Sequence, residues 1–167
     1  HFLTELLYQL IEKFRKEVPG IHLRTTLMVG HPGETEQDFE ELMEFVRAAR
    51  FERMGAFAYS EEEGTYSAKH YKDEIPQEVK QQRLDKLMEL QQEIAFDLAE
   101  EMIGREVLVM IEGKVADENA YVGRTYKDAP NVDGLIFVES EEELMSGDFA
   151  RVRITGALEY DLMGEII

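Results

Sequence analysis

The residues best placed to hold a ligand lie in the stretch VGHPGE, residues 29–34, where an apolar run meets a charged amphipathic segment. Gly30 would let the backbone approach a ligand closely, because glycine has no side chain. Backbone amides at the start of the following helix would lack helical partners there and could donate to a ligand. Gly-x-Pro-Gly also makes a plain turn, and neither a G-x-G-x-x-G fingerprint nor a Walker loop is present. The stretch therefore predicts a ligand edge without fixing the ligand.

Other reactive side chains do not combine into a catalytic set. No H-x-x-x-H spacing occurs among the four histidines, which argues against a zinc site, and no G-x-S-x-G turn surrounds Ser60. The acidic run Glu61 to Glu63 could supply acid and base, but adjacent loop carboxylates are usually just exposed. The chain has no cysteine, which excludes thiolate nucleophiles, disulfides and cysteine-held iron-sulfur clusters on these residues.

The charge balance is strongly acidic along the whole length. Of the formal net charge of -18, residues 1–100 contribute -9, from 12 basic and 21 acidic side chains, and residues 101–167 contribute -9, from 6 and 15. Such a surface repels phosphate backbones within a Debye length of about 10 Å, although acidity can also serve only solubility. No apolar run approaches the roughly 20 residues of a membrane-spanning helix, and no leader precedes the first helix. We expect a cytoplasmic protein with basic partners, no membrane, and nucleic acid as the less favoured partner.

The first half of the chain predicts a βαβ unit. Apolar residues at three- and four-residue spacing predict a helix over Leu3–Val18, and Ile21–Val29 suits a strand covered on both faces. Thr35 can cap the next helix, and a second strand follows over Met54–Tyr59. Short joints predict parallel strands with a right-handed crossover. Because two such strands do not make a stable sheet, and the chain starts at His1 without Met, we expect a piece of something longer.

The second half predicts a long helix followed by a small barrel. Residues 61–74 are polar and irregular, as in a lid or linker, and helical spacing then runs from Pro76 to Gly104. About 40 Å of helix could bridge two domains or simply pack. After Gly104 the period changes to two, which predicts an antiparallel barrel of five strands. Their sequences are REVLVMIEG, AYVGRT, GLIFVES, FARVRIT and YDLMGEII.

Four segments resemble one enzyme family in sequence order. They are RTTLMVGHPGETEQDFEEL (24–42), RFERMGAFAYSEEEGT (50–65), ELQQEIAFDL (89–98) and VGRTYKDAPNVDG (122–134). Together they resemble the radical S-adenosylmethionine methylthiotransferases, and more specifically the RimO branch, which modifies a ribosomal protein. The resemblance covers essentially the whole chain.

The resemblance implies an α/β fold with three parts. Residues 1–75 would be the C-terminal part of a radical S-adenosylmethionine (β/α) barrel, residues 76–103 a connecting helix, and residues 104–167 a TRAM domain, a five-stranded antiparallel OB-like β-barrel. The implied activity adds a methylthio group to the β-carbon of an aspartate of small-subunit ribosomal protein twelve.

The resemblance also implies cofactors that this chain cannot hold alone. The family uses S-adenosylmethionine and two four-iron four-sulfur clusters. Neither the C-x-x-x-C-x-x-C motif nor the three N-terminal cysteines can lie here, because the chain has no cysteine. We therefore assign no catalytic residue and no metal ligand, and expect this chain alone to be inactive.

Two groups of candidate site residues follow from the resemblance. Those expected along the adenine and ribose of S-adenosylmethionine, or alternatively in barrel core, are Thr26, Met28, Gly30 and Ala58. Those expected on the substrate side, or alternatively in a tight connection held by Gly123 and Pro130, are Gly123, Arg124, Thr125, Tyr126, Lys127 and Asp128. Glu34 resembles the acidic end of a glycine-rich strand motif, or simply caps the next helix.

Two alternative functions remain open at the level of sequence. One is a tRNA-adenosine methylthiotransferase, and the other is a non-catalytic module whose acidic barrel docks basic proteins. The net charge of -9 over residues 101–167 favours a basic ribosomal protein over tRNA. Four basic side chains could still gather on one face of the barrel: Arg124, Lys127, Arg151 and Arg153. Oligomeric state and sulfur donor are not predicted.

Overall fold

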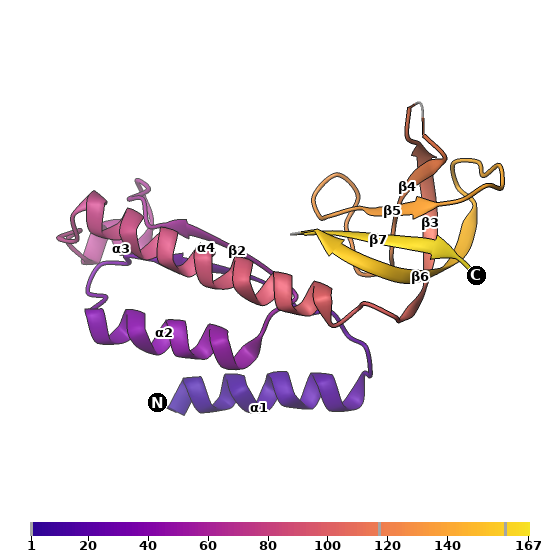
Figure 1. The fold of residues 1–167 in the computed structure, drawn as a ribbon. Helices are drawn as coiled ribbons and strands as arrows, with labels where there is room; N and C mark the ends of the chain where they lie inside the picture. The colour runs from indigo at the N-terminus through magenta and orange to yellow at the C-terminus, as the bar shows by residue number, and fades with distance from the viewer. Residues whose placement is uncertain (1, 117, 159) are drawn as a thin grey trace. The chain divides into compact units, whose positions relative to one another are not determined.

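The chain divides into two compact units. The computed structural model describes residues 2–116, 118–158 and 160–167. The units are His1–Ile94 and Ala95–Ile167, and the boundary falls inside the longest helix (Figure 1). No described helix is long and apolar enough to cross a membrane.

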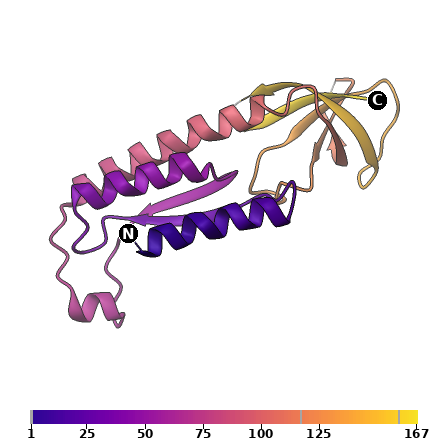
Figure 2. The same cartoon turned by 90° about the horizontal axis from the view of Figure 1, so that it is seen from below.

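The first unit contains the predicted βαβ arrangement. Its elements are α1 (Phe2–Glu17), β1 (Arg24–Val29), α2 (Glu36–Ala49), β2 (Arg53–Ala58), α3 (Tyr66–His70) and the start of α4 (Gln77–Glu100). β1 and β2 are parallel, in a register running from Arg24 opposite Arg53 to Val29 opposite Ala58. In Figure 2, α2 and α4 run side by side along one flank of these strands. The prediction of parallel strands joined by a helix is confirmed.

The predicted cap fixes where α2 begins. The Thr35 hydroxyl accepts from the Asp38 amide at 3.1 Å, while the Asp38 carboxylate accepts from the Thr35 amide at 2.8 Å. This reciprocal pair satisfies two amides that a helix N-terminus otherwise leaves open. Arg50 ends α2 in the left-handed conformation, with φ of 45°. Strand β2 can therefore start three residues later.

Strand β1 differs from its prediction, because one of its faces is open. Thr25, Leu27 and Val29 point toward the packed side, whereas Arg24, Thr26 and Met28 are exposed. Only two strands and one layer of helices pack together among the described residues, so one sheet face has no cover. The packed side meets apolar residues of α2, β2 and α4, among them Phe39, Val46, Met54, Leu87 and Leu90.

The second unit is a closed barrel. Its strands are β3 (Glu106–Lys114), β4 (Ala120–Arg124), β5 (Ile136–Glu139), β6 (Phe149–Leu158) and β7 (Asp161–Ile166), in the order β3-β4-β5-β7-β6. Strand β6 alternates as predicted, with Val152 and Ile154 buried and Arg151 and Arg153 exposed. The barrel core consists of Met102, Val109, Ile111, Tyr121, Ile136, Val138, Ala150, Val152 and Ile154.

The predicted all-antiparallel pairing is wrong at one seam. Strands β5 and β7 pair in parallel, with Ile136 opposite Leu162 and Glu139 opposite Glu165. The other four pairings are antiparallel. A closed ring with an odd number of strands cannot alternate direction at every step, so one parallel pair is required.

Candidate cofactor edge and substrate-side turn

The turn after β1 is built around Gly30. Its φ is +74°, a conformation that glycine adopts without strain. The Gly30 amide donates to both carboxylate oxygens of Glu34, each at 3.0 Å. The same carboxylate accepts from Nη1 of Arg83 on α4 at 2.6 Å. Glu34 thus ties the end of β1 to α4 and does not cap α2, whose cap is Thr35.

A buried lysine fills the space beside Gly30. A Cβ at position 30 would lie 2.4 Å from Cγ of Lys80, so only glycine fits against this side chain. Lys80 is 2% exposed, and its ammonium donates to Oδ2 of Asp73 at 2.5 Å and to the carbonyl of Tyr59 at 3.3 Å. Lys80 therefore contacts the ends of both strands.

The four predicted cofactor residues lie at three different places on this edge. Thr26 and Met28 are on the open face of β1, whereas Gly30 is buried in the turn. Ala58 pairs with Val29, so its side chain points to the packed face. The open face continues on β2 through Phe57, which is opposite Met28 and 47% exposed. Ala58, and not Phe57, is the residue that the sequence analysis singled out from this strand, although the two-residue period of a strand places the two on opposite faces.

The open face fits part of S-adenosylmethionine. Met28 is 41% exposed, and together with Phe57 it presents a flat, polarizable surface of the kind that packs against an aromatic base. Gly30 is less suited to a direct cofactor contact, because its amide already donates to Glu34 and the space beside its Cα is filled by Lys80. Of the four predicted residues, Thr26 and Met28 are thus the two whose side chains lie on the open face, and Gly30 shapes the turn.

The segment after β2 is tied to the same edge through His31. The imidazole Nδ1 is 3.1 Å from the carbonyl of Pro32, and Nε2 is 3.2 Å from Oγ of Ser67 on α3. Tyr59 donates its hydroxyl hydrogen to Ser67 at 3.0 Å. A neutral ring protonated on Nδ1 satisfies all three contacts, because Ser67 then donates to Nε2. The polar segment expected to be a lid or linker is thus held against β1.

Four of the six predicted substrate-side residues, Thr125 to Asp128, form an ordered turn after β4. The hydroxyl of Thr125 donates to Oδ2 of Asp128 at 2.7 Å and accepts from the Lys127 amide at 3.2 Å. Thr125 is 3% exposed, whereas Tyr126 is 71% exposed. The turn therefore holds Tyr126 out toward solvent.

Gly123 and Arg124 precede this turn at the end of β4. A Cβ at Gly123 would lie 2.6 Å from the carbonyl oxygen of Met110, which explains glycine there by packing. Nε of Arg124 donates to Glu112 at 2.8 Å.

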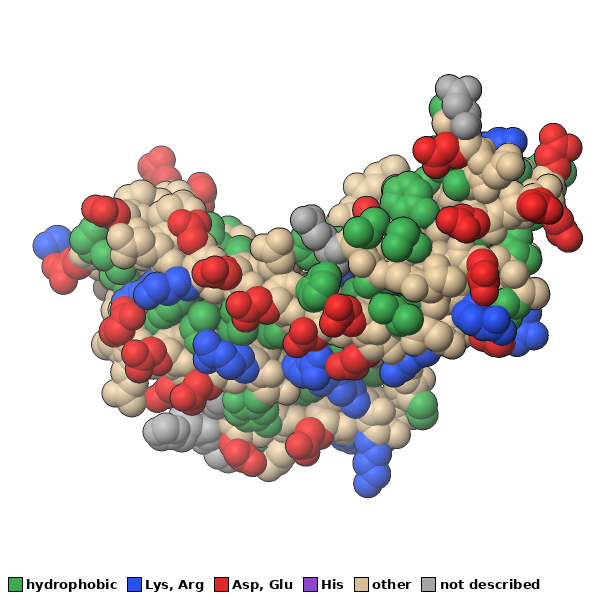
Figure 3. Space-filling view, in the orientation of Figure 1, with side chains coloured by type: hydrophobic (Ala, Val, Ile, Leu, Met, Phe, Trp, Pro, Cys, Tyr) green, Lys and Arg blue, Asp and Glu red, His purple; other side chains and the backbone are tan. Residues whose placement is uncertain are grey.

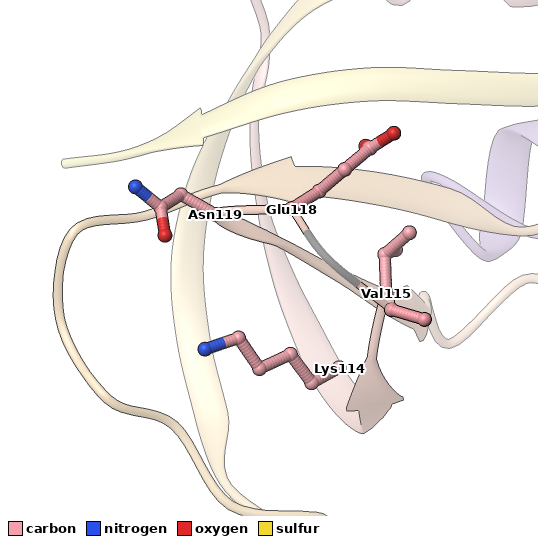
Figure 4. A pocket seen from close by; sticks show the side chains of 5 residues that line it. Lys114, Val115, Glu118 and Asn119 are labelled. Atoms are coloured by element: carbon pink, nitrogen blue, oxygen red, sulfur yellow. The ribbon is translucent and has the colours of Figure 1, made fainter.

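Two shallow hollows lie at the other end of β4. The first has a volume of about 450 Å³ and is lined by Lys114, Val115, Ala116, Glu118 and Asn119 (Figure 4). The second, of about 480 Å³, is lined by four carboxylates and three other residues: Glu118, Asn119, Ala120, Glu139, Ser140, Glu141 and Glu165. Within the described part of the chain, no group of three or more acidic, histidine or cysteine residues could hold a metal ion.

Comparison with known proteins gives two findings. Residues 103–167 match the family described as TRAM domain. Residues 103–167 are a TRAM domain. Over 96% of its length the chain is also 61% identical to the ribosomal protein uS12 methylthiotransferase RimO of Phocaeicola vulgatus. It is 60% identical to the protein of that name in Bacteroides thetaiotaomicron and 58% to that in Lachnoclostridium phytofermentans, again over 96% of its length. The resemblance to the methylthiotransferases of the RimO branch is confirmed.

The relatives are much longer than this chain. It spans 37% of the length of the Phocaeicola relative and 36% of the other two. The TRAM family description covers residues 103–167, and the match to the relatives extends over residues before 103 as well.

Three arginines of the TRAM domain lie beside carboxylates. Arg153 lies 3.5 Å from Glu106 and 3.7 Å from Glu165, and Arg151 lies 4.0 Å from Glu106. Arg124 pairs with Glu112 as described above. Three of the four basic residues that could have formed a cationic face thus each have a carboxylate within 4.0 Å. Figure 3 shows acidic side chains over the visible surface of the domain, with few basic ones among them.

Proposed function

We propose that the chain is part of a methylthiotransferase that modifies ribosomal protein uS12 at the β-carbon of one aspartate. The observation that supports this most strongly is identity of 52–61% over nearly the whole chain to proteins carrying the uS12 methylthiotransferase name. This identity extends through both units of the chain. The intact protein would be longer, since the chain spans 37% of the length of the first of those relatives.

The first unit supplies one wall of the S-adenosylmethionine site. Thr26 and Met28, with Phe57 beside them, lie along the adenine, while Gly30 and Ala58 shape the edge of the two strands. S-adenosylmethionine, when bound beside an iron-sulfur cluster, would be the source of the radical and the donor of the methyl group. The wall orients the cofactor and keeps water from its reacting end. The cysteine ligands of both four-iron clusters lie in the rest of the protein, because this chain has no cysteine.

Exposed apolar faces in the first unit support a larger barrel. Five apolar residues of α1 and the segment after it are 42–50% exposed: Leu6, Leu7, Leu10, Phe14 and Val18. The open face of β1 and β2 adds Met28 and Phe57. Surfaces of this kind are normally covered in a folded protein. The remaining strands and helices of the barrel would cover them.

The TRAM domain holds the protein substrate. Tyr126 is the exposed member of the turn that runs from Thr125 to Asp128, and an exposed tyrosine on a rigid turn is a common anchor in protein interfaces. The domain's acidic balance and paired arginines favour a basic ribosomal protein over tRNA. The site of action would be the cytoplasm, where ribosomal proteins assemble.

The test is methylthio transfer by the full-length protein with both clusters reconstituted. Purified uS12 and, separately, tRNA are incubated with S-adenosylmethionine, a reductant and a sulfide source, and both products are analysed by mass spectrometry. We expect one aspartate of uS12 to carry a methylthio group and tRNA to be unchanged. Residues 1–167, incubated alone, should leave uS12 unmodified. Modification of tRNA but not uS12 would replace this proposal with the tRNA-modifying alternative.

A further inference from the structure

The first two turns of α4 carry two buried cations on one face. Lys80 and Arg83 are three residues apart, a spacing that places side chains next to each other on a helix. They are 2% and 7% exposed. Further along the same helix, the buried positions are mainly apolar, including Leu87, Leu90 and Ile94. The two buried cations lie in the part of α4 that contacts the ends of β1 and β2, and the buried apolar positions follow them along the helix.

Arg83 holds the end of β1. Its Nη1 donates to Oε1 of Glu34 at 2.6 Å and to the Glu34 carbonyl at 3.3 Å, and its Nη2 donates to Glu36 at 3.1 Å. The Glu34 side chain is 13% exposed and accepts the Gly30 amide through both oxygens. The position of Gly30 is therefore set by a carboxylate whose own position is set by Arg83.

Lys80 holds the end of β2 and the side of Gly30. Its ammonium donates to the Tyr59 carbonyl, the first one after β2, and lies 5.0 Å from the centre of the Tyr59 ring. Its second partner is Asp73, which belongs to the segment that follows α3. Its hydrocarbon stem fills the space where a Cβ of Gly30 would lie. One side chain thus fixes the spacing between the two strand ends.

Buried charges at these positions are costly unless they meet a specific need. Desolvation of an ammonium or guanidinium is repaid only by close, well-aligned partners, and apolar residues of similar volume often stabilise a fold as well. Here the partners are backbone and side-chain groups of the turns that end β1 and β2. The arrangement therefore favours a role in setting the geometry of these turns.

We propose that Lys80 and Arg83 are positioning residues of the cofactor site: they touch no ligand themselves and set the places of Gly30 and Tyr59 at its edge. This inference rests on the proposed function, in which that edge borders S-adenosylmethionine. A displacement of about 1 Å in a site can cost as much as about a hundredfold in rate. The same displacement would also weaken the contacts that hold the cofactor, so we expect loss of either cation to lower cofactor affinity.

The test measures S-adenosylmethionine binding to the full-length, cluster-reconstituted protein by isothermal titration calorimetry. The variants are Lys80→Met and Arg83→Met, which keep a long side chain and remove the charge. Lys86→Met is the matched control, because Lys86 is an exposed lysine on the same helix. Arg83→Lys keeps the charge but cannot reach both Glu34 and Glu36 with a planar fork, and it serves if Arg83→Met does not fold. Hydrogen exchange over residues 24–35 reports the edge independently of cofactor.

We expect Kd to rise about tenfold or more in Lys80→Met and Arg83→Met, to rise less in Arg83→Lys, and to stay unchanged in Lys86→Met. The rate of hydrogen exchange over residues 24–35 should rise most in Lys80→Met and Arg83→Met, less in Arg83→Lys, and not at all in Lys86→Met. Folded Arg83→Met or Lys80→Met that binds the cofactor like the wild type overturns this inference and leaves the proposed function intact. A wild-type protein that does not bind S-adenosylmethionine overturns both.

Discussion

Glu34 and Arg83 form a nearly buried ion pair across 49 residues of sequence, with Nη1 of Arg83 2.6 Å from Oε1 of Glu34. Their side chains are 13% and 8% exposed. The pair fixes the Gly30 amide, which donates to the same carboxylate. The turn that follows β1 consequently depends on a residue of α4, a helix that also enters the TRAM-containing unit.

The coupling between these two residues should be measurable. In a double-mutant cycle with Glu34→Gln and Arg83→Met, we expect a coupling of about 1–3 kcal/mol, because both changes disrupt one hydrogen-bonded network. Amide exchange at Gly30, measured by NMR or mass spectrometry, reports the free energy of opening. Additive effects of the two substitutions would show that Glu34 and Arg83 act separately on the turn.

The barrel should be sensitive to a methyl group at Gly123. In Gly123→Ala the new Cβ would lie 2.6 Å from the Met110 carbonyl oxygen and 2.6 Å from Val109 Cγ1. Because the first of these neighbours is backbone, strands β3 and β4 must separate, and we expect a loss of about 1–3 kcal/mol. Gly113→Ala, in the partner strand β3 with nothing within 4 Å of the new Cβ, is the matched control. Thermal unfolding of both variants should show a lower Tm for Gly123→Ala alone.

The cap of α2 should make the free energy of unfolding depend on pH in the acid range. The hydrogen bond from the Thr35 hydroxyl is the main cause that lowers the pKa of Asp38, followed by the bond from the Thr35 amide. Because the folded pKa lies below the unfolded one, this contribution is present above the ordinary aspartate pKa of about 3.9 and is lost as pH falls through the lower folded value.

Carboxyl NMR should therefore place the titration midpoint of Asp38 below about 3.9. The substitution Thr35→Ala should move the midpoint back toward that value, because it removes the hydroxyl donor. Asp38→Asn should destabilise the protein at neutral pH and have less effect in acid. A midpoint at or above the ordinary value would show that the capping pair does not form in solution.

Tyr126 should contribute to substrate binding without a role in chemistry. It is 71% exposed on the turn after β4, so Tyr126→Ala should leave the fold intact. We expect KM for uS12 to rise about tenfold with kcat nearly unchanged, a change that corresponds to about 1.4 kcal/mol of lost binding. Tyr160→Ala serves as a control, because Tyr160 is another exposed tyrosine of the barrel unit. Equal KM values for wild type and Tyr126→Ala would remove the turn from the substrate interface.

The elements of the fold were accessible from sequence because their signals are local. Three- and four-residue apolar spacing predicted α1 and α4, and Thr35 marked the start of α2. Two-residue alternation in β6 correctly predicted that Arg151 and Arg153 lie on the opposite face from Val152 and Ile154. The parallel β5–β7 seam was missed because strand direction in a closed barrel depends on the number and order of strands, which no single strand records.

The candidate site was harder to predict because its contacts are distant in sequence. Gly30 was singled out from its own turn, but its partners Lys80 and Arg83 lie about fifty residues away on a helix whose pattern looks ordinary. Ala58 was chosen where Phe57 shares the open face with Met28, since register between β1 and β2 is a property of the pair. Tyr126 and its neighbours were predicted from the resemblance. The sequence does not record the hydrogen bond between Thr125 and Asp128 that shapes their turn.

The central claim is that this chain belongs to an enzyme that modifies uS12, and the most direct measurement is the mass of uS12 in cells. Ribosomes are isolated from the source organism and from a strain lacking the gene, and intact uS12 is weighed by mass spectrometry. The account predicts that uS12 loses the mass of one methylthio group in the deletion strain and regains it when the full-length gene is restored. An identical uS12 mass in both strains would contradict it.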